Sequence, residues 1–333
     1  MVNEVLTLLK NAEDYLSGEE MSKVLGVTRA SIWKTINKLK EQGYTIESST
    51  RKGYRIKEVP NIITKSEVLE ELHTQLLGRE IVYYEEISST NEEAKQLARE
   101  GCQEGLVVIA DQQLLGKGRL GRNWSSPAGT GIWMSLVLRP PILPLQASTL
   151  TLVAGLSLCE AIEAVTGLEA RIKWPNDIVV NGKKVCGILT EMSAELEGIK
   201  YVILGIGINV NTPHFPEDLP YASSLYLEGK QQYIRKDILK EFLMRFEKDY
   251  FTYLEVPTFQ NFIQRYEAKC ITLNKKVKIL ASSQEYVAYA KAITEEGMLK
   301  VVTEQGEEKI ILAGEVSVRG LYGYVDEEKE KGV

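Results

Sequence analysis

The sequence predicts an α+β protein of three domains: a helical N-terminal part, a central α/β part built on a mixed sheet, and a small all-β C-terminal part. Apolar residues recur at helical spacing through roughly the first sixty residues. Strand-like and helix-like segments then alternate, and the last part holds short strand-like runs separated by hairpin turns. We place the domains at residues 1–63, 64–270 and 271–325.

The composition is that of a soluble globular protein. A chain of 333 residues with 44% hydrophobic content is long enough to bury more than one core. The net charge of −6 argues against attraction of nucleic acid to the whole surface, although a local basic patch stays compatible with it. The four cysteines form no CxxC pair and there are only two histidines, so we predict neither a disulfide framework nor a zinc site. We expect a cytoplasmic protein, because the sequence shows neither a signal peptide nor a membrane-spanning run.

Three short helices and a hairpin are predicted for residues 1–63. Ser17 and Glu20 have capping-box spacing and open the second helix, while Thr28 is placed to cap the third. The hairpin joins strands at 44–47 and 54–57. The residues expected to face inward are Leu6, Leu9 and Leu16 in the first helix, Met21, Val24 and Leu25 in the second, and Ile32, Ile36 and Leu39 in the third.

The distribution of charge indicates a function for this N-terminal part. Residues 22–57 carry nine cations against two acids, a local charge of +7 in an acidic chain. A basic helix followed by a basic hairpin is typical of a winged helix-turn-helix domain that reads DNA. The alternative is a winged helix that serves only protein interaction, because fold does not fix function. The DNA contacts we predict are Ser31, Trp33, Lys34 and Asn37 in the groove, and Arg51 and Lys52 against phosphates or the minor groove.

The central part is predicted to hold a mixed sheet, because several of its strands are joined by turns too short for parallel crossovers. Strands are expected at 81–86, 105–111, 131–139, 171–174, 178–180, 185–194 and 201–210, and helices at 91–100, 145–166, 236–254 and 257–267. In the C-terminal part, strands at 277–280, 285–293, 299–303 and 309–312 are separated by hairpin signals and fit a small barrel.

The segment 116–122, GKGRLGR, is the first candidate binding element. It places three glycines and three cations in seven residues, so its backbone can approach an anion while Lys117, Arg119 and Arg122 supply charge. It lacks the GKS or GKT ending of a Walker A loop. Taken alone, such a segment is equally compatible with a solvated hairpin tip.

Five motifs in order remove that ambiguity: SSTN at 88–91, Gln113 followed by GKGRLGRNW, KWPND at 173–177, KKVCGILTE at 183–191 and GIGINV at 205–210. With them the chain resembles, over essentially its whole length, bacterial biotin protein ligases of the bifunctional class, which are also biotin operon repressors. The resemblance implies a biotin/lipoate ligase-like central domain and an SH3-like C-terminal barrel. The usual family loop is GRGRRGR, so Lys117 and Leu120 depart from it, and Leu120 loses a charge.

The resemblance also implies a reaction and its partners. Biotin's carboxylate attacks the α-phosphorus of ATP, with Mg²⁺, so that pyrophosphate leaves and biotinyl-5'-AMP forms. The amine of a lysine on a biotin carboxyl carrier protein then opens this mixed anhydride and takes the biotin, and AMP leaves. No covalent enzyme intermediate is required, so catalysis consists of positioning and charge stabilisation. Biotinyl-5'-AMP is further expected to act as corepressor by promoting a homodimer that binds operator DNA.

Matching motif positions gives the implied residue roles. The catalytic residues are Arg119, Lys184 and Lys173. The biotin contacts are Ser89, Thr90, Asn91, Gln113, Lys117, Gly118, Arg119 and Lys184. The nucleotide contacts are Arg122, Trp124, Asn176, Asn209 and Arg319, and Asp177 is placed to hold Mg²⁺ through water.

Several alternatives stay open at this point. Residues 88–91 would serve equally as a helix N-cap, and Asn176-Asp177 after a proline as a simple turn. Trp133 and Leu136 supply either pocket wall or core. A DNA-binding biotin sensor without ligase activity would not require the phosphate-facing cations. A lipoate or octanoate ligase would not require paired polar groups for a ureido ring, which Ser89, Thr90 and Gln113 provide.

Overall fold

The computed structural model describes residues 1–195, 198–281, 285–313 and 316–320. The chain divides into two compact units, of which the first is Met1–Ile62 and the second begins at Ile63.

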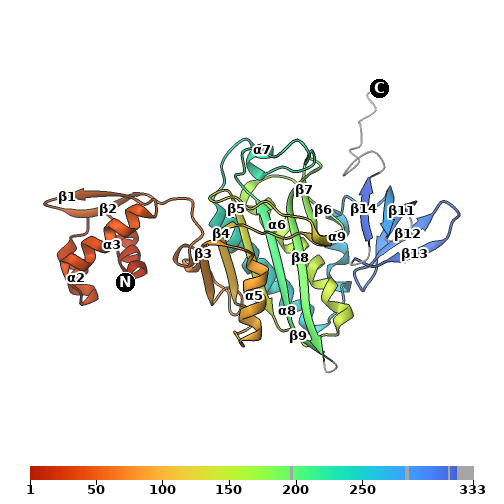
Figure 1. Cartoon of the computed structure of the whole chain (residues 1–333), viewed down its shortest axis with the longest axis horizontal. Coiled ribbons are helices and arrows are strands. Elements are labelled where there is room, and N and C mark those ends of the chain that lie inside the picture. Colours follow the sequence, from red (N-terminus) through yellow and green to blue (C-terminus); the bar gives the residue numbers. More distant parts are fainter. Residues whose placement is uncertain (196–197, 282–284, 314–315, 321–333) are drawn as a thin grey trace. The chain divides into compact units, whose positions relative to one another are not determined.

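The first unit is a bundle of three helices followed by a hairpin (Figure 1). Ser17 and Glu20 form both bonds of the predicted capping box, and the Thr28 hydroxyl accepts from the Ser31 amide at 3.2 Å. Both caps therefore begin their helices where the sequence predicts. The elements are α1 (Val2–Asn11), α2 (Gly18–Leu25), α3 (Arg29–Glu41), β1 (Thr45–Ser49) and β2 (Gly53–Glu58).

Most of the expected inner face of this unit is confirmed, with two exceptions. Ile32, Ile36 and Leu39 are buried as predicted. Val24 is 67% exposed, because the short helix α2 buries a narrow stripe centred on Met21. Leu16 lies beyond the end of α1, where it forms a β-bridge with Tyr54.

The second unit contains a seven-stranded sheet of order β3-β4-β5-β9-β8-β7-β6. Only the β3–β4 pair is parallel, with α5 between the two strands, and the other pairs in this order are antiparallel. The mixed sheet is thus confirmed. Its strands are β3 (Ile81–Ile87), β4 (Val107–Gln113), β5 (Gly131–Leu138), β6 (Ala170–Lys173), β7 (Asp177–Val180), β8 (Lys183–Glu195) and β9 (Gly198–Asn209).

Helices cover this sheet unequally (Figure 1). On one face, α5 (Thr90–Arg99) packs Ala94 and Ala98 into a small cluster with Val137 and Ile203. On the other, α6 (Ala147–Thr166) and α8 (Arg235–Glu255) build the main core. By length and composition, residues 144–166 could cross a membrane, but 72% of that apolar window is buried inside the protein, as in a core helix.

The C-terminal segment forms an antiparallel sheet of order β13-β12-β11-β10-β14. Val277, Ile279 and Val301 from this sheet belong to the same hydrophobic core as α6 and α8. The short helices α4 and α7 were not predicted, and the expected helix at 257–267 is a 3₁₀ turn followed by α9. The bounds are β10 (Lys275–Ala281), β11 (Glu285–Ile293), β12 (Leu299–Thr303), β13 (Glu308–Ile311), β14 (Val316–Gly320), α4 (Lys65–Leu69), α7 (Leu225–Gly229), the 3₁₀ turn (Gln260–Phe262) and α9 (Ile263–Lys269).

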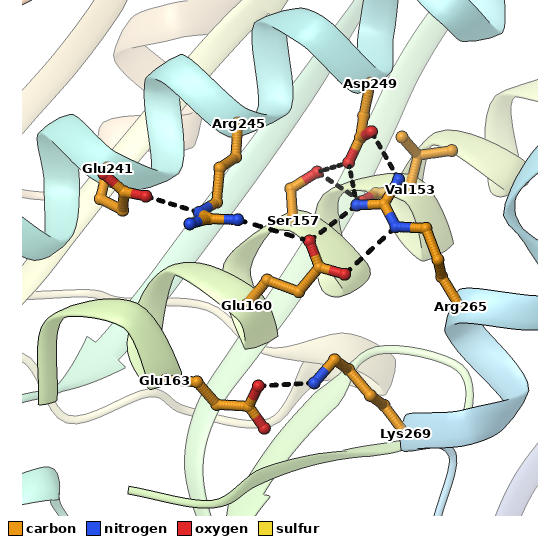
Figure 2. Close-up of polar contacts among 9 residues, drawn as sticks. All are labelled: Val153, Ser157, Glu160, Glu163, Glu241, Arg245, Asp249, Arg265 and Lys269. Carbon is orange, nitrogen blue, oxygen red and sulfur yellow. Dashed lines mark hydrogen bonds and ion pairs between the residues drawn. The ribbon is translucent and has the colours of Figure 1, made fainter. Parts of the chain in front are cut away.

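A polar network joins α6, α8 and α9 on the side of the sheet away from α5 (Figure 2). Asp249 is buried and accepts from the Ser157 hydroxyl at 2.8 Å and from Arg265 Nη1 at 2.8 Å. The same guanidinium donates to Glu160 through Nη2 at 2.7 Å. A buried carboxylate is stable only with such donors, and one of them, Arg265, lies in α9. The network therefore holds α9 against α6 and α8.

We predict that Asp249→Asn lowers the free energy of unfolding by about 2 kcal/mol. The buried asparagine amide then lies against the Arg265 guanidinium without the negative charge that Asp249 supplies. The loss is moderate because Arg265 is partly exposed. Chemical denaturation monitored by circular dichroism measures it. The matched control, Glu241→Gln, breaks the partly exposed pair with Arg245 and should cost less than about 0.5 kcal/mol. Equal losses in the two variants would contradict the assignment.

Candidate functional site

The candidate site lies at the edge of the central sheet where β3 and β4 end. Because these strands are parallel, the segments that follow Ile87 and Gln113 emerge at the same edge. Two backbone bonds join them: Leu114 N donates to Ile87 O at 2.9 Å, and Leu115 N to Ser88 O at 2.8 Å. The SSTN and GKGRLGR motifs are thereby brought together.

Three neighbouring glycines, Gly187, Gly205 and Gly207, leave one face of the sheet without side chains next to this edge. Gly207 pairs with Trp133 on one side and with Gly187 on the other, and Gly205 pairs with Ser135. A Cβ at Gly205 would lie 2.1 Å from Asn91 Oδ1, and one at Gly207 would lie 2.4 Å from Trp124 Nε1. The side chains of Asn91 and Trp124 therefore rest directly on bare backbone, which only glycine permits.

Short polar side chains form a connected cluster at the start of α5. The Gln113 side-chain oxygen accepts from the Thr90 amide at 2.9 Å and lies 3.1 Å from the Thr90 hydroxyl. Gln113 Nε2 donates to the Ser126 hydroxyl at 2.9 Å. The buried Ser135 hydroxyl lies 2.8 Å from Thr90 Oγ1. Ser89 is the N-cap residue of α5 but its side chain makes no capping bond, so capping does not engage this buried hydroxyl.

Asn91 is held inside the protein at both ends of its amide. Its Oδ1 lies 2.5 Å from the Ser135 hydroxyl, and its Nδ2 donates to Glu191 Oε2 at 2.8 Å. Lys95 Nζ donates to the other Glu191 oxygen at 2.6 Å. Asn91 is one of the predicted biotin contacts, and in this structure both ends of its amide have protein partners.

The GKGRLGR segment folds back on itself. Gly118 N donates to Arg122 O at 2.7 Å, and Trp124 N donates to Gly116 O at 2.8 Å. Leu120 lies at its tip with φ 56° and is 68% exposed, a backbone region that a leucine rarely adopts. Lys117 pairs with Glu92 of α5 at 2.7 Å. The tip is thus a compact turn, and Lys117 beside it is already directed toward a protein acceptor.

Arg119 reaches away from the loop tip to two distant parts of the chain. Its Nη1 donates to Asn176 Oδ1 at 2.8 Å, and its Nη2 donates to the Ala313 carbonyl. Burial lowers the pKa of the guanidinium, while the charge of Asp177 acts in the opposite direction. Since arginine stays protonated in proteins, this side chain remains a partly desolvated cation between the two motifs and the C-terminal segment.

Lys184, Asp177 and Trp124 form a second charged group above Gly187. Lys184 Nζ lies 2.5 Å from Asp177 Oδ1 and 5.2 Å from the centre of the Trp124 ring. Trp124 Nε1 is buried and has no hydrogen-bond partner among the described residues. An unsatisfied donor beside a cation is a fit for a ligand acceptor.

The backbone of Lys184 is fixed by the segment that follows β9. Lys184 N donates to Tyr221 O at 2.7 Å, and Ser223 N donates to Lys184 O at 2.8 Å. Asn209 Nδ2 donates to Ser223 O at 3.0 Å. Lys183, which the alternation of strand residues directs away, is half exposed and pairs with Glu228.

The KWPND corner is attached to the C-terminal segment. Lys173 and Asp177 face each other across β6 and β7. Trp174 N donates to Thr272 Oγ1 at 3.0 Å, and the Trp174 indole donates to Gly297 O at 3.2 Å. Asn176 Nδ2 donates to Ile188 O at 3.0 Å. The corner is therefore a turn that is held to its neighbours by side-chain hydrogen bonds.

Within the described ranges, no group of three or more His, Cys, Asp or Glu side chains gathers to hold a metal ion. The Asp177 carboxylate faces Lys184. A single carboxylate such as that of Asp177 fits a Mg²⁺ that arrives with the phosphates of a ligand, because Mg²⁺ is commonly held by one or two carboxylates together with phosphates.

The remaining predicted residues fall into separate places. Trp33, Lys34, Arg51 and Lys52 are exposed on the first unit, whereas Ser31 and Asn37 are half-buried there. Among the described residues, no ion pair engages Lys34 or Arg51. Trp133 and Leu136 are fully buried, and Leu136 belongs to the main core. Arg122 is exposed beside the loop, and Arg319 lies in β14 opposite Lys278, with its side chain outside the described part.

The sequence reasoning missed several residues of this site, namely Ser126, Ser135, Glu191, Ser223 and Thr272. Ser135 could have been found from the sequence, because it is the one polar residue in the apolar strand IWMSLVL. Glu191 could also have been found, because it lies four positions after Gly187 in the same strand and therefore on the same face of the sheet.

Profiles of three families match consecutive parts of the chain. Residues 2–55 match an HTH domain, residues 83–209 the biotin/lipoate A/B protein ligase family, and residues 272–319 the biotin protein ligase C-terminal domain.

Whole-chain relatives agree with these profiles. The chain is 39% identical over 304 residues to the bifunctional ligase/repressor BirA of Bacillus spizizenii, covering 90% of this chain and 93% of the relative. It is 28% identical to BirA of Escherichia coli, covering 95% and 96%. Among solved structures, the biotin protein ligase from Aquifex aeolicus in complex with biotin and ATP is 35% identical with a TM-score of 0.64, covering 73% of this chain and 99% of that one.

We predict that Gly207→Ala displaces the Trp124 indole, because the added methyl would lie 2.4 Å from Nε1. Acrylamide quenching of tryptophan fluorescence should increase, and near-ultraviolet circular dichroism should change. In the control Gly155→Ala the added methyl meets nothing closer than 3.8 Å. If both variants match the parent protein, Trp124 does not rest on Gly207.

Proposed function

The chain belongs to the family of bifunctional biotin ligase/repressors, and on this premise we propose that it is an ATP-dependent biotin protein ligase that also represses transcription. One observation carries the ligase part: Arg119 and Lys184, two cations from separate motifs, converge with Asn176 and Asp177 beside the polar cluster of Thr90 and Gln113.

The reaction we propose has two steps. A biotin carboxylate oxygen attacks the α-phosphorus of ATP, pyrophosphate leaves, and biotinyl-5'-AMP forms. The amine of a lysine on a biotin carboxyl carrier protein then attacks the carbonyl of this mixed anhydride, and AMP leaves. Both steps build charge on oxygens, and preorganised cations in a partly desolvated site stabilise that charge.

Each group of residues suits one part of the substrates. We assign the ureido end of biotin to Ser89, Thr90 and Gln113, where short hydroxyl and amide groups are already fixed. Lys117, Gly118, Arg119 and Lys184 would close on the biotin carboxylate and the α-phosphate, with Lys173 supplying further positive charge. Because the Asn91 amide is engaged by Ser135 and Glu191, its part in biotin binding is indirect.

The nucleotide would lie over the glycine-lined face. Trp124 offers an aromatic surface and an unsatisfied N–H, and Asn176, Asn209, Arg122 and Arg319 complete the proposed set. Mg²⁺ would enter with ATP, neutralise its phosphates and reach Asp177 through water.

The two alternatives differ from this proposal in identifiable ways. A biotin sensor without ligase activity would not require Arg119 and Lys184 to converge. A lipoate ligase would bind a ring with no N–H, for which the polar cluster around Thr90 is poorly suited. Exchange of labelled pyrophosphate into ATP, dependent on the added acid, separates all three.

We predict biotin-dependent ATP–pyrophosphate exchange in the intact protein and a fall of about a hundredfold in the Arg119→Ala variant, whose transition-state charge is no longer stabilised. The adenylate should also leave this variant faster. Arg99→Ala, which removes an exposed cation at the end of α5, should exchange normally. Exchange with lipoate but not with biotin would establish the lipoate alternative, and tight biotin binding without exchange would establish the sensor.

We propose that the first unit is a winged helix whose α3 and β1–β2 hairpin contact operator DNA, and that the C-terminal sheet is an SH3-like barrel. In this arrangement residues 1–63, 64–270 and 271–325 form three functional domains.

Biotinyl-5'-AMP would act as corepressor by favouring a homodimer in the cytoplasm, which lets two winged helices read an inverted repeat. The exposed, basic outer surface of α3 supports the DNA assignment.

We predict that Lys34→Ala weakens binding to a short duplex of random sequence and reduces the salt dependence by about one ion, because Lys34 has no acidic partner in the described part of the chain. Fluorescence anisotropy over a salt series measures both. Lys23→Ala is the matched control, since Glu19 already pairs with Lys23 at 3.0 Å, and it should have a smaller effect. Equal slopes for Lys34→Ala and the parent protein would remove Lys34 from the interface.

A further inference from the structure

We propose that Glu228 is a positioning residue for Lys184. It ties the turn that precedes β8 to the segment that follows β9, and it thereby holds the backbone from which Lys184 reaches the site. The inference rests on the proposed function, because it takes Lys184 to contact the reacting carboxylate and the α-phosphate. Glu228 lies in the short helix α7, outside the five sequence motifs.

A bulge in β8 turns Lys184 toward the site. The register with β7 shifts next to Val179, and Val185 is left as an extra residue on β8. Val185 and Cys186 are consecutive, yet both belong to the main core. In a regular strand residues 184 and 187 would lie on opposite faces. Because of the bulge they share one face, and a Cβ on Gly187 would lie 3.2 Å from Lys184 Nζ.

The bulged end of β8 needs support, because a bulge interrupts the ladder and bends the strand. The pairing of β8 with β9 ends at Cys186, so Lys184 lies beyond it. Residues 221–223, which come after β9 in the chain, continue the pairing. Tyr221 O accepts from Lys184 N at 2.7 Å, and Ser223 N donates to Lys184 O at 2.8 Å. These two bonds hold the backbone of Lys184 on the side that β9 does not reach.

Glu228 joins the two supports of Lys184. The Ser223 hydroxyl donates to Glu228 Oε1 at 2.5 Å, and Asn181 Nδ2 donates to Glu228 Oε2 at 2.9 Å. Ser223 belongs to the segment beside Lys184, and Asn181 lies in the turn between β7 and β8. The Glu228 side chain is only 9% exposed. One largely buried carboxylate therefore holds the turn and the segment together, next to Lys184.

Glu228 is ionised at neutral pH. Burial raises its pKa, but the hydrogen bonds from Ser223 and Asn181 and the charge of Lys183 lower it, and the net shift of the pKa is downward. A carboxylate has two acceptor oxygens, so it can serve both donors at once. The Lys183 ammonium is 3.5 Å away and half exposed, so this ion pair contributes little. The two hydrogen bonds therefore make the connection.

The position of Lys184 decides which charges its ammonium can reach. Its Nζ lies 2.5 Å from Asp177 Oδ1. A displaced backbone would move this cation away from the charge that develops in the adenylation step, and catalysis by oriented groups falls steeply with such displacements. The polar cluster around Thr90, to which we assign the ureido end of biotin, would stay in place. Glu228 should therefore influence the rate of adenylation more than the binding of biotin.

The test measures biotin-dependent ATP–pyrophosphate exchange in Glu228→Ala. We expect kcat to fall about tenfold, with the KM for biotin changed less than about threefold. Glu228→Gln should stay within about threefold of the parent protein, because its oxygen accepts from Ser223 and the Asn181 amide can turn over to accept from its nitrogen. A glutamine variant as slow as the alanine variant would show an effect of charge alone, and would overturn the inference.

Ser223→Ala removes a single hydroxyl and covers the case in which Glu228→Ala does not fold. It should lower kcat about threefold with the KM for biotin unchanged. The variant with both changes should fall no further than Glu228→Ala alone, because both changes break the same connection. Losses that multiply in the double variant would mean that Glu228 does not act through Ser223, and would contradict the inference.

Two controls separate positioning from loss of the ion pair and from loss of stability. Lys183→Gln removes only the exposed ion pair and should exchange as the parent protein does. Asp249→Asn lowers stability in a network away from the site and should also exchange normally while it is folded. An unchanged kcat in folded Glu228→Ala and Ser223→Ala would overturn the inference while leaving the ligase proposal intact. A parent protein without biotin-dependent exchange would instead refute the proposed function.

Discussion

The bare stretch of sheet at Gly205, Gly207 and Gly187 is the constraint on which the candidate site depends. Side chains along a strand alternate between faces, and these glycines leave one face empty where Asn91 and Trp124 settle. Glycine weakens a strand because it costs backbone entropy and buries no side chain. The opposite face compensates, since the alternate residues of β9, Leu204, Ile206 and Ile208, pack into the main core.

A second property of the site is that three of its cations already have protein partners. Arg119 donates to Asn176, Lys184 lies against Asp177, and Lys117 against Glu92. An anionic ligand therefore exchanges these contacts for its own rather than adding to them. Net binding free energy is the difference between the two sets, which favours ligands that present several negative oxygens at once.

Local patterns were readable from the sequence, and contacts between distant residues were not. The caps at Ser17 and Thr28 and the buried stripe of α3 follow from spacing over a few residues, and so does the mixed character of the sheet, because short turns join several of its strands. Arg119 and Ala313 are 194 positions apart, and Asn91 and Glu191 are 100 apart. Nothing local encodes such pairs. Val24 was wrongly expected to face inward for a similar reason. The spacing of apolar residues marks one side of a helix, but it does not show how much of that side the other helices cover.

The two bonds that anchor Trp174 have a consequence for biosynthesis. Its partners, Thr272 and Gly297, follow it by 98 and 123 positions. Until the ribosome has synthesised Thr272 and Gly297, the corner that carries Lys173 and Asp177 has no support from these two partners. These two bonds can therefore form only after the residues up to 297 have left the ribosome, long after the strands on either side of the corner.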